Sequence, residues 1–478
     1  MLFNTLNFAL FLPIVFMLYW SIKSKHIKWQ NGLLLVASYF FYSCWDWRFL
    51  FLLLFSTLLD YYTGIKISDT KNSKTKKIWL WISIGINLGF LGVFKYYNFF
   101  AESFAEAISQ MGFQVNTYTL QIILPVGISF YTFHGLSYVI DIYYKRISAE
   151  KDFVDYSLFV SFFPLLVAGP IERATHLLPQ LKKERNFNYA EAVIGLKQIL
   201  WGLFKKVVIA DQCAEYANMI FNNADSYYGS TLLLGAVFFA FQIYGDFSGY
   251  SDIALGTAKL FGINLLKNFS FPYFSRDIAE FWRRWHISLS SWFKDYLYIP
   301  LGGSQGGLWK KIRNTFIIFL VSGFWHGASW TFIAWGAINA LYFLPLLISN
   351  KNRTNIDVVA QHTILPNPKE FMQMSITFLL TTMAWIFFRV DSLTEAFQYI
   401  NNICSPTLFS LPQQRPSILI TLISIFIVIE WVGRRNDFAI ATLFQKQLKP
   451  IRWSFYVIIC LSIFIFQGKE QQFIYFQF

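Results

Sequence analysis

Residues 322–330 read SGFWHGASW, and the interpretation of the whole chain starts from this stretch. It lies inside an apolar run, residues 315–348, that contains no Lys, Arg, Asp or Glu. A run of roughly 18 or more apolar residues is typical of a membrane-spanning helix. This run is long enough for one tilted span, or for one span and part of a second. His326 lies about 11 residues into it, about 16 Å at helical rise, which is about half the depth of a hydrocarbon core.

An ionisable side chain at that depth is costly, so His326 is a candidate functional residue. Histidine exchanges protons near neutral pH because its ordinary pKa lies close to that pH. Gly323 and Gly327 flank it and allow another backbone or a thin ligand to approach closely. The alternative is a histidine that is hydrogen-bonded between helices and has no chemical role. The neighbouring Gly and Trp residues favour the functional interpretation.

The composition indicates a polytopic α-helical membrane protein. Of 478 residues, 55% are hydrophobic and only 14% are charged, and the mean hydropathy is +0.42. Soluble proteins are about a quarter charged, and transmembrane β-barrels alternate apolar and polar residues, which these runs do not. The net charge of +13 comes from basic residues in loops between apolar runs. It therefore reflects the positive-inside bias of membrane proteins, and we expect no nucleic-acid partner.

The cysteines and histidines give little support to disulfides or metal sites. The four cysteines lie far apart, in or beside apolar stretches, and no CxxC occurs. The six histidines never pair at i, i+3 or i+4. We therefore expect no metal site and no tightly bound cofactor.

We expect a single integral-membrane domain over residues 1–478, with about 10–12 transmembrane or re-entrant helices and core motifs at about 120–345. Segment 33–44 is short enough to be re-entrant, and segment 153–169 ends in Ala-Gly-Pro, which suggests a broken helix. The candidate spans lie near residues 2–20, 32–44, 47–65, 78–97, 120–140, 153–169, 192–210, 230–262, 315–349, 371–389, 416–433 and 453–467.

The first loops predict the orientation. Loops 21–31 and 66–77 are rich in lysine and should be cytoplasmic, whereas loop 98–118 carries acidic residues and no Lys or Arg. The amino terminus should therefore be extracytoplasmic. The first apolar stretch, residues 3–20, has no basic segment before it and no A-x-A site after it, so we interpret it as a retained span rather than a cleaved signal.

Residues 276–299 read RDIAEFWRRWHISLSSWFKDYLYI and show a helical pattern of apolar residues. Arg283, Arg284 and Lys294 fall on other faces, so the pattern predicts an amphipathic helix at the membrane interface. An ordinary peripheral helix on anionic lipid would show the same pattern. His286 shares a flank with Arg283 and Ser290, so it lines the mouth of a site or caps the interface. The glycine-rich turn 300–307 that follows is only a weak phosphate-site signal, since it lacks the Gly-Lys-Ser/Thr ending of a P-loop.

A polar cluster, QIYGDFSGYSD at residues 242–252, lies inside another apolar stretch. Its carboxylates, Asp246 and Asp252, should be paired or should face a cavity, because isolated charges are costly at membrane depth. With Ser248 they could form either a tunnel-lining network or an interhelical polar network, and the pattern favours neither.

Taken together, these stretches resemble the membrane-bound O-acyltransferase superfamily, and most closely its bacterial alginate O-acetyltransferase branch. The resemblance runs over about residues 1–470. The motifs that carry it are QIYGDFSGYSD (242–252), NFSFPY (268–273), FWRRWHISLSSWFKDYLYIPLGGS (281–304) and FWHGA (324–328), with support from LPVGISFYTF (124–133) and AGPIE (168–172).

The resemblance implies an all-α polytopic membrane fold around a central tunnel, with interfacial amphipathic helices. It implies that His326 is the membrane-buried histidine of the family and that His286 is its second histidine, on the cytoplasmic side. In this branch the activity is transfer of acetyl from cytoplasmic acetyl-CoA towards an extracytoplasmic polysaccharide such as alginate. The implied setting is the bacterial cytoplasmic (inner) membrane, with a separate exported or membrane-anchored SGNH-type acetyltransferase as partner.

The residues fit this chemistry. A charged thioester donor, either acyl-CoA or an acyl carrier protein, needs a basic inner mouth, for which Arg283, Arg284 and Lys294 are candidates, with Lys310 and Lys311. The acceptor hydroxyl needs a base in a desolvated tunnel, and His326 suits that role. His286 would position donor or acceptor, and Asp246 would orient part of the tunnel.

Three alternatives share some of these features. A transporter of saccharide-linked lipid would also have many spans and intramembrane polar groups, but the chain shows no inverted-repeat signature. A D-alanyl transferase for teichoic acid would keep the fold and change the cargo. O-acetylation of peptidoglycan or cellulose would change only the acceptor polymer.

Overall fold

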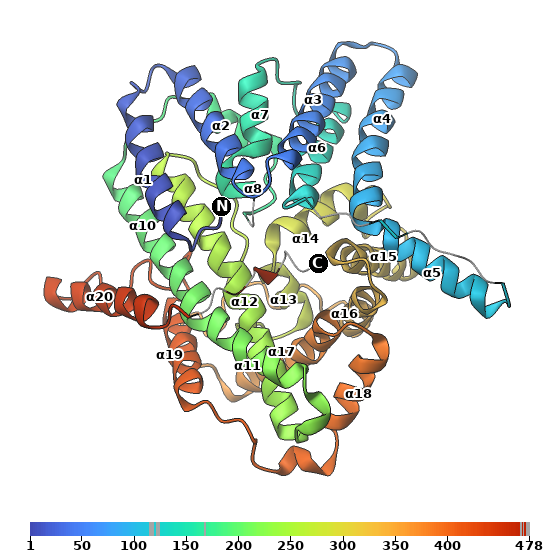
Figure 1. The fold of residues 1–478 in the computed structure, drawn as a ribbon, viewed down its shortest axis with the longest axis vertical. Coiled ribbons are helices and arrows are strands. Elements are labelled where there is room, and N and C mark those ends of the chain that lie inside the picture. The colour runs from blue at the N-terminus through green and yellow to red at the C-terminus, as the bar shows by residue number, and fades with distance from the viewer. Residues whose placement is uncertain (114–118, 121–124, 167–168, 469–470, 472, 475–478) are drawn as a thin grey trace. The chain divides into compact units, whose positions relative to one another are not determined.

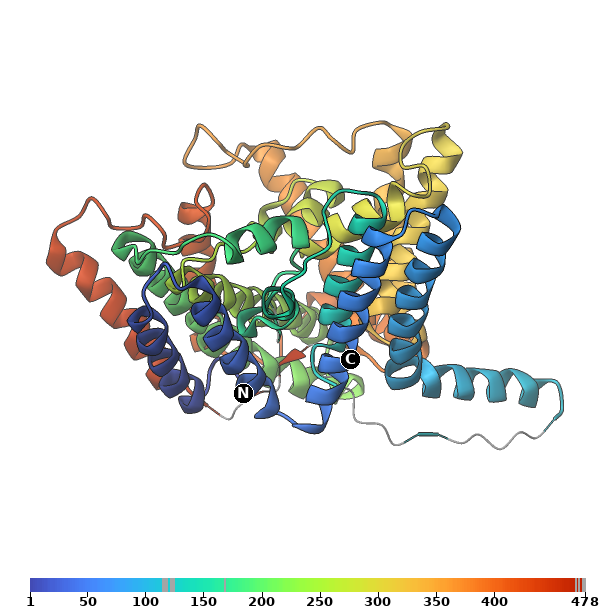
Figure 2. The same ribbon diagram turned by 90° about the horizontal axis from the view of Figure 1, so that it is seen from above.

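The computed structural model describes residues 1–478 except 114–118, 121–124, 167–168, 469–470, 472 and 475–478. Within these described residues every regular element is a helix, which confirms the predicted all-α class. Figures 1 and 2 draw these helices from two directions. The backbone contacts divide the chain into two compact units. Unit 1 comprises residues 1–189 and 258–266, and unit 2 comprises residues 190–257 and 267–478.

Unit 1 holds the first nine helices. Its centre is a group of three mutually packed helices, α3, α4 and α6. The buried Asp60 of α3 accepts hydrogen bonds from Ser83 Oγ (2.6 Å) and Asn87 Nδ2 (2.9 Å) of α4. The helices are α1 (Leu6–Ser21), α2 (Ile27–Ser43), α3 (Arg48–Asp69), α4 (Ser73–Leu91), α5 (Tyr97–Gln110), α6 (Ile128–Tyr143), α7 (Phe153–Ser161), α8 (Phe163–Leu166) and α9 (Ala174–Leu181).

Apart from Tyr189 and residues 258–260, the remaining helices belong to unit 2, among them the long, mostly buried helix α12. Helices α15 and α16 form a tightly packed antiparallel pair (Figure 1). The helices are α10 (Tyr189–Phe204), α11 (Asp211–Phe221), α12 (Gly229–Leu260), α13 (Ile278–Arg284), α14 (Ile287–Phe293), α15 (Leu308–His326), α16 (Trp330–Ile348), α17 (Pro368–Arg389), α18 (Leu393–Ile403), α19 (Ser417–Gly433) and α20 (Lys449–Ile465).

Five helical segments of the described chain are long and apolar enough to cross a membrane. Shorter apolar helices, such as Leu6–Ser21 and Ser417–Gly433, accompany them. Large apolar side chains on these helices are exposed, including Leu10 and Ile14 of α1 and Val428 of α19, as expected where lipid covers the surface. The five segments are Arg48–Asp69, Ser73–Gln110, Gly229–Leu260, Trp330–Ile348 and Pro368–Arg389.

The predicted single helix over 276–299 is wrong. The chain leaves the helix after Arg284 and re-enters it at Ile287, and a π-helical turn, Lys294–Tyr298, follows α14. The break is stabilised by backbone hydrogen bonds to segment 268–270: Ile287 N donates to Asn268 O, and Ser270 N donates to Arg284 O (both 2.9 Å). These bonds take the place of helical i→i−4 bonds at this point.

The structure also shows how two other predicted segments are arranged. The apolar run 315–348 is two helices separated by a short turn, and Ser329 caps α16 by accepting a hydrogen bond from Thr331 N. Segment 153–169 is broken, as expected, between α7 and α8. Parts of the predictions for 120–140 and 153–169 fall on residues 121–124 and 167–168, outside the described residues.

Candidate functional site

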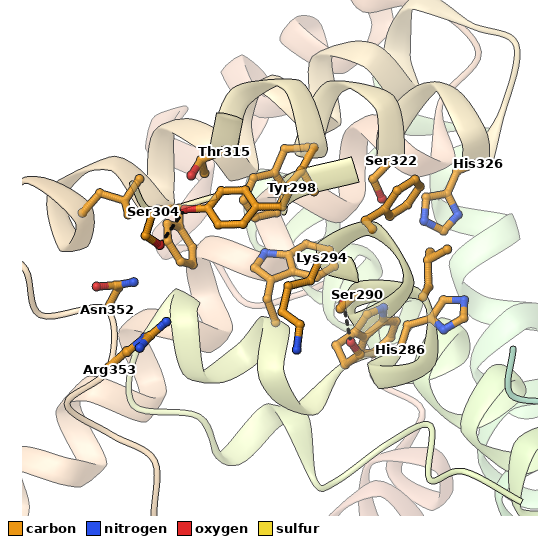
Figure 3. Close-up of a pocket in the computed structure, with 18 residues that line it drawn as sticks. His286, Ser290, Lys294, Tyr298, Ser304, Thr315, Ser322, His326, Asn352 and Arg353 are labelled. Carbon is orange, nitrogen blue, oxygen red and sulfur yellow. Dashed lines mark hydrogen bonds between the residues drawn. The ribbon is translucent and has the colours of Figure 1, made fainter. Parts of the chain in front are cut away.

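Both predicted histidines line one cavity of about 220 Å³ in unit 2 (Figure 3). His286 comes from the break between α13 and α14, and His326 is the last residue of α15. The walls are largely aromatic and apolar, and polar side chains are spread along the length of the cavity. The lining residues other than the histidines include Trp282, Trp285, Leu289, Ser290, Phe293, Lys294, Tyr298, Ser304, Thr315, Phe319, Ser322, Phe343, Asn352 and Arg353.

His326 is buried among aromatic rings. Its ring centroid lies 4.8 Å from that of Trp325, and it meets Trp335 and Phe388 in edge-on contacts at 5.2 Å. The helix ends directly after it, because Gly327 is extended (φ −161°). The aromatic packing holds the imidazole in place and keeps its surroundings poor in water, which suits a proton-transfer residue.

His286 is also buried, and its hydrogen bonds define its tautomer. Its Nδ1 lies 2.9 Å from Asn268 Oδ1, which also accepts from Ser288 Oγ at 3.0 Å. Because the amide oxygen can only accept, Nδ1 of His286 is the donor and Nε2 is the basic nitrogen. Burial lowers the pKa of the His286 imidazole to about 3, so the ring is neutral at physiological pH.

The end of the cavity away from the histidines is polar and basic. Figure 3 shows Ser304, Asn352 and Arg353 at this end, with Lys294 between them and His286. Lys294 is largely exposed, and its Nζ lies 3.5 Å from Asp295 Oδ1. The cavity therefore runs from a cationic mouth to a histidine-lined end.

Arg283 and Arg284 are the other predicted donor-binding residues. Both form hydrogen bonds with other residues of the protein. Arg283 donates to Asn352 O (2.8 Å) and Asn355 O (2.6 Å). Arg284 pairs with Glu280 (2.8 Å) and donates to Asp357 O (2.8 Å). Of the predicted basic residues, Lys294 lines the cavity, whereas these two arginines are not among its lining residues.

The predicted network of Asp246, Ser248 and Asp252 is built around two buried lysines of unit 2. Lys206 Nζ lies 2.8 Å from Asp246 Oδ1, and Lys205 Nζ lies 2.6 Å from Asp252 Oδ2 and 2.9 Å from Ser248 Oγ. Both carboxylates are therefore paired, which is one of the two arrangements expected for them. None of these residues lines the histidine cavity. Asp246 Oδ2 also accepts from Ile474 N (2.7 Å), which ties the carboxyl-terminal segment to α12.

Sequence reasoning gave no role to several residues that build this region. Lys205 and Lys206 carried a usable signal, since charged residues within the apolar stretch 192–210 need partners. Asn268, which orients His286, lies in the NFSFPY motif, but only the fold places it beside a histidine 18 residues later. Arg353 lies in a polar loop whose pattern gives no indication of a site.

Comparison with known proteins identifies a family. Residues 144–384 match the model of a family described as MBOAT, the membrane-bound O-acyltransferase family. The matched region includes both cavity histidines and the helices that carry them.

Two of the relatives described next match over much more of the chain than the family model does, and a third matches over less than half of it. A protein from Pseudomonas aeruginosa named "Probable alginate O-acetylase AlgI" is 39% identical over 81% of this chain and 72% of its own length. A "Peptidoglycan O-acetyltransferase" from Helicobacter pylori is 37% identical over 84% of this chain and 79% of its own. A "Teichoic acid D-alanyltransferase" from Streptococcus thermophilus is 32% identical over 45% of this chain and 55% of its own.

Proposed function

Because this chain belongs to the membrane-bound O-acyltransferase family, we propose that it moves an acetyl group from cytoplasmic acetyl-CoA across the membrane for O-acetylation of an exported polysaccharide. The enzyme is a multi-pass membrane O-acyltransferase. The single observation that carries the proposal is the cavity shared by His286 and His326, which joins a cationic mouth to a buried, aromatic-walled base.

In the proposed reaction His326 removes the proton from the acceptor hydroxyl. The oxygen attacks the acetyl carbonyl carbon, the carbon–sulfur bond breaks, and the proton passes to the departing thiolate, so the products are an acetyl ester and free CoA thiol. His286 is neutral, and its Nε2 accepts a hydrogen bond that positions donor or acceptor. The aromatic walls exclude water that would otherwise hydrolyse the thioester.

The names of the relatives support this choice of cargo and acceptor. The proteins named for alginate and peptidoglycan O-acetylation match over most of the chain, which favours acetyl transfer to an exported polymer. The protein named for D-alanyl transfer matches over less than half of it, so D-alanyl transfer to teichoic acid is the second candidate. A saccharide-lipid transporter remains the alternative from a different class.

The proposed setting is the bacterial inner membrane, with the amino terminus extracytoplasmic. Lysines 23, 25 and 28 in loop 21–31, and those in loop 66–77, would then face the cytoplasm. A separate exported or membrane-anchored SGNH-type acetyltransferase would complete transfer to the extracytoplasmic polysaccharide.

The test is transfer of label from radiolabelled acetyl-CoA in membranes that contain wild type or His326→Ala. We expect label to move to polymer or partner in wild type and to fall by at least about a thousandfold in His326→Ala, because the base that takes the acceptor's proton is lost. His362→Ala, at an exposed loop position, is the matched control and should keep wild-type activity. Full activity of a folded His326→Ala protein would remove the proposed mechanism.

A wild-type protein that is inactive with acetyl-CoA but active with a D-alanyl carrier protein would replace the proposed donor with that of the second candidate. Movement of unmodified saccharide-linked lipid, without any acyl transfer, would favour the transporter.

A further inference from the structure

The loop between α16 and α17, residues 349–367, is held in place by arginines at its amino-terminal half. Arg283 donates to the main-chain oxygens of Asn352 and Asn355, and Arg276 and Arg284 both donate to that of Asp357 (2.9 and 2.8 Å). Because these bonds go to backbone carbonyls, they fix the course of the chain whatever side chains the loop carries.

Two further arginines hold the other half. Arg434 Nη2 donates to the main-chain oxygens of Ala360 and Thr363, and Arg435 Nη2 donates to the same two oxygens, all at 2.9 Å. Long loops without secondary structure are usually either functional or disordered. Because arginines hold both halves of this loop in place, it is ordered, and we therefore interpret it as a functional loop.

The loop delivers Asn352 and Arg353 to the mouth of the histidine cavity (Figure 3). Arg353 differs from the bracing arginines, because its guanidinium has no hydrogen bond or ion pair with any residue that the structure describes. It is exposed and lies at the same end of the cavity as Ser304. An arginine with all its donors available at a cavity mouth is suited to a phosphate, which it can bind through two parallel hydrogen bonds.

The length of the cavity matches the reach of a phosphopantetheine arm, which carries a phosphate at one end and a sulfur at the other. Its lining follows α15 from Thr315 to His326, which is about 16 Å at helical rise. A phosphopantetheine arm has about thirteen bonds between sulfur and phosphorus, and an extended chain spans roughly 3.3–3.6 Å per three bonds, so the arm reaches about 15 Å. With its phosphate at the mouth, such a donor would place its thioester close to His326.

We propose that Arg353, presented by the arginine-braced loop, binds the phosphate of a phosphopantetheine-bearing acyl donor. This inference rests on the acyl transfer proposed above and adds the residue that recognises the donor. In this arrangement Arg283 and Arg284 support the loop, and Arg353 makes the contact with the phosphate.

The test measures equilibrium binding of phosphopantetheine and of pantetheine, which lacks the phosphate, to the full chain in lipid nanodiscs. Wild type should bind phosphopantetheine about tenfold more tightly than pantetheine. Arg353→Ala should abolish this difference without changing the affinity for pantetheine, and Arg353→Lys should keep part of it, because lysine retains the charge but not the fork. Lys351→Ala removes the same charge two residues away, outside the cavity lining, and should bind like wild type.

An unchanged phosphate preference in Arg353→Ala would overturn the assignment. Acetyl transfer by the same samples separates this failure from that of the proposed function. Active wild type combined with an unaffected phosphate preference in Arg353→Ala would remove only the role of Arg353. Loss of the preference in Arg353→Ala, combined with wild type that transfers nothing, would remove the proposed acetyl transfer and retain the phosphate site.

Two donors carry this phosphate, and a second pair of measurements distinguishes them. If the pantetheine phosphate is what Arg353 binds, Arg353→Ala should weaken CoA and a phosphopantetheine-loaded carrier protein by similar factors, whichever of the two is the better donor. A loss confined to CoA would assign Arg353 to the adenosine phosphates and would overturn the proposal.

Discussion

At the residue scale, the two cavity histidines differ in how they are held. His326 is packed among rings, whereas His286 is tied to Asn268 and takes a left-handed backbone conformation (φ 42°). This conformation is uncommon for a residue with a side chain, and it is retained here because the hydrogen bonds of segment 268–270 define the turn. Both the backbone and the side chain of His286 are therefore committed to one geometry.

The burial of His286 predicts a pH dependence of stability. The pKa of His286 is about 3 in the folded protein, and that of an unfolded histidine is about 6.5, so between these values only the unfolded chain binds the proton. The free energy of unfolding should therefore fall as pH decreases below about 6.5, by about 1 kcal/mol at pH 5.5.

His286→Asn tests this prediction, because asparagine tolerates the left-handed conformation and does not titrate. The loss of thermal stability in detergent between pH 7.5 and 5.5 should be smaller in His286→Asn than in wild type. His362→Asn, at an exposed position, should lose as much as wild type. Equal losses of thermal stability in all three proteins would show that His286 does not cause the loss between pH 7.5 and 5.5.

At the element scale, close packing of α15 against α16 determines where His326 lies. A Cβ atom added to Gly323 would lie 2.2 Å from the carbonyl oxygen of Phe332, and one added to Gly336 would lie 2.3 Å from that of Phe319. The two backbones can approach this closely only because both positions are glycine. The hairpin fixes the end of α15 and, with it, the position of His326.

Gly323→Ala should separate the two helices. We expect it to destabilise the protein by about 1–3 kcal/mol, because the added methyl group meets backbone rather than a movable side chain. It should also lower acyl transfer, since His326 lies three residues away. Gly89→Ala on α4, where the added atom meets nothing within 4 Å, is the control and should leave thermal stability equal or slightly higher. Equal unfolding temperatures for wild type and Gly323→Ala would contradict the packing argument.

At the scale of the whole molecule, charged groups are buried in both units, and ion pairing is extensive in unit 2. Lys206 lies between Asp246 of α12 and Asp211 of α11, so one cation joins two helices (2.8 and 2.7 Å). Its side chain is almost completely buried. A buried pair adds little net stability, but removal of one partner leaves an uncompensated charge.

Lys206→Met should therefore be strongly destabilising, by about 3–5 kcal/mol. The triple variant Lys206→Met, Asp246→Asn, Asp211→Asn should recover much of this loss, because the buried charges are removed together. Lys446→Met, at an exposed position, should have no measurable effect. Thermal unfolding in detergent compares the three variants with wild type, and a stable Lys206→Met protein would show that the pair is not energetically coupled.

The sequence by itself determined the class of the protein and singled out His326 as a candidate functional residue. Long uncharged runs and low charge content indicate apolar helices, because these properties depend only on local composition and on transfer between water and lipid. His326 could be selected for the same reason, since a titratable group in such a run is costly. The expectation that Asp246 and Asp252 are paired or face a cavity also followed from the sequence alone.

Only the tertiary structure decided how these residues are combined. Periodicity predicted one helix over 276–299, but hydrogen bonds to residues 268–270 break it and turn His286 into the cavity of His326. The charge of the donor made Arg283 and Arg284 candidates for binding it, whereas the fold directs hydrogen bonds of both to loop carbonyls some 70 residues later. Local patterns report solvent preference and backbone propensity; contacts between distant segments depend on three-dimensional packing, which no local pattern records.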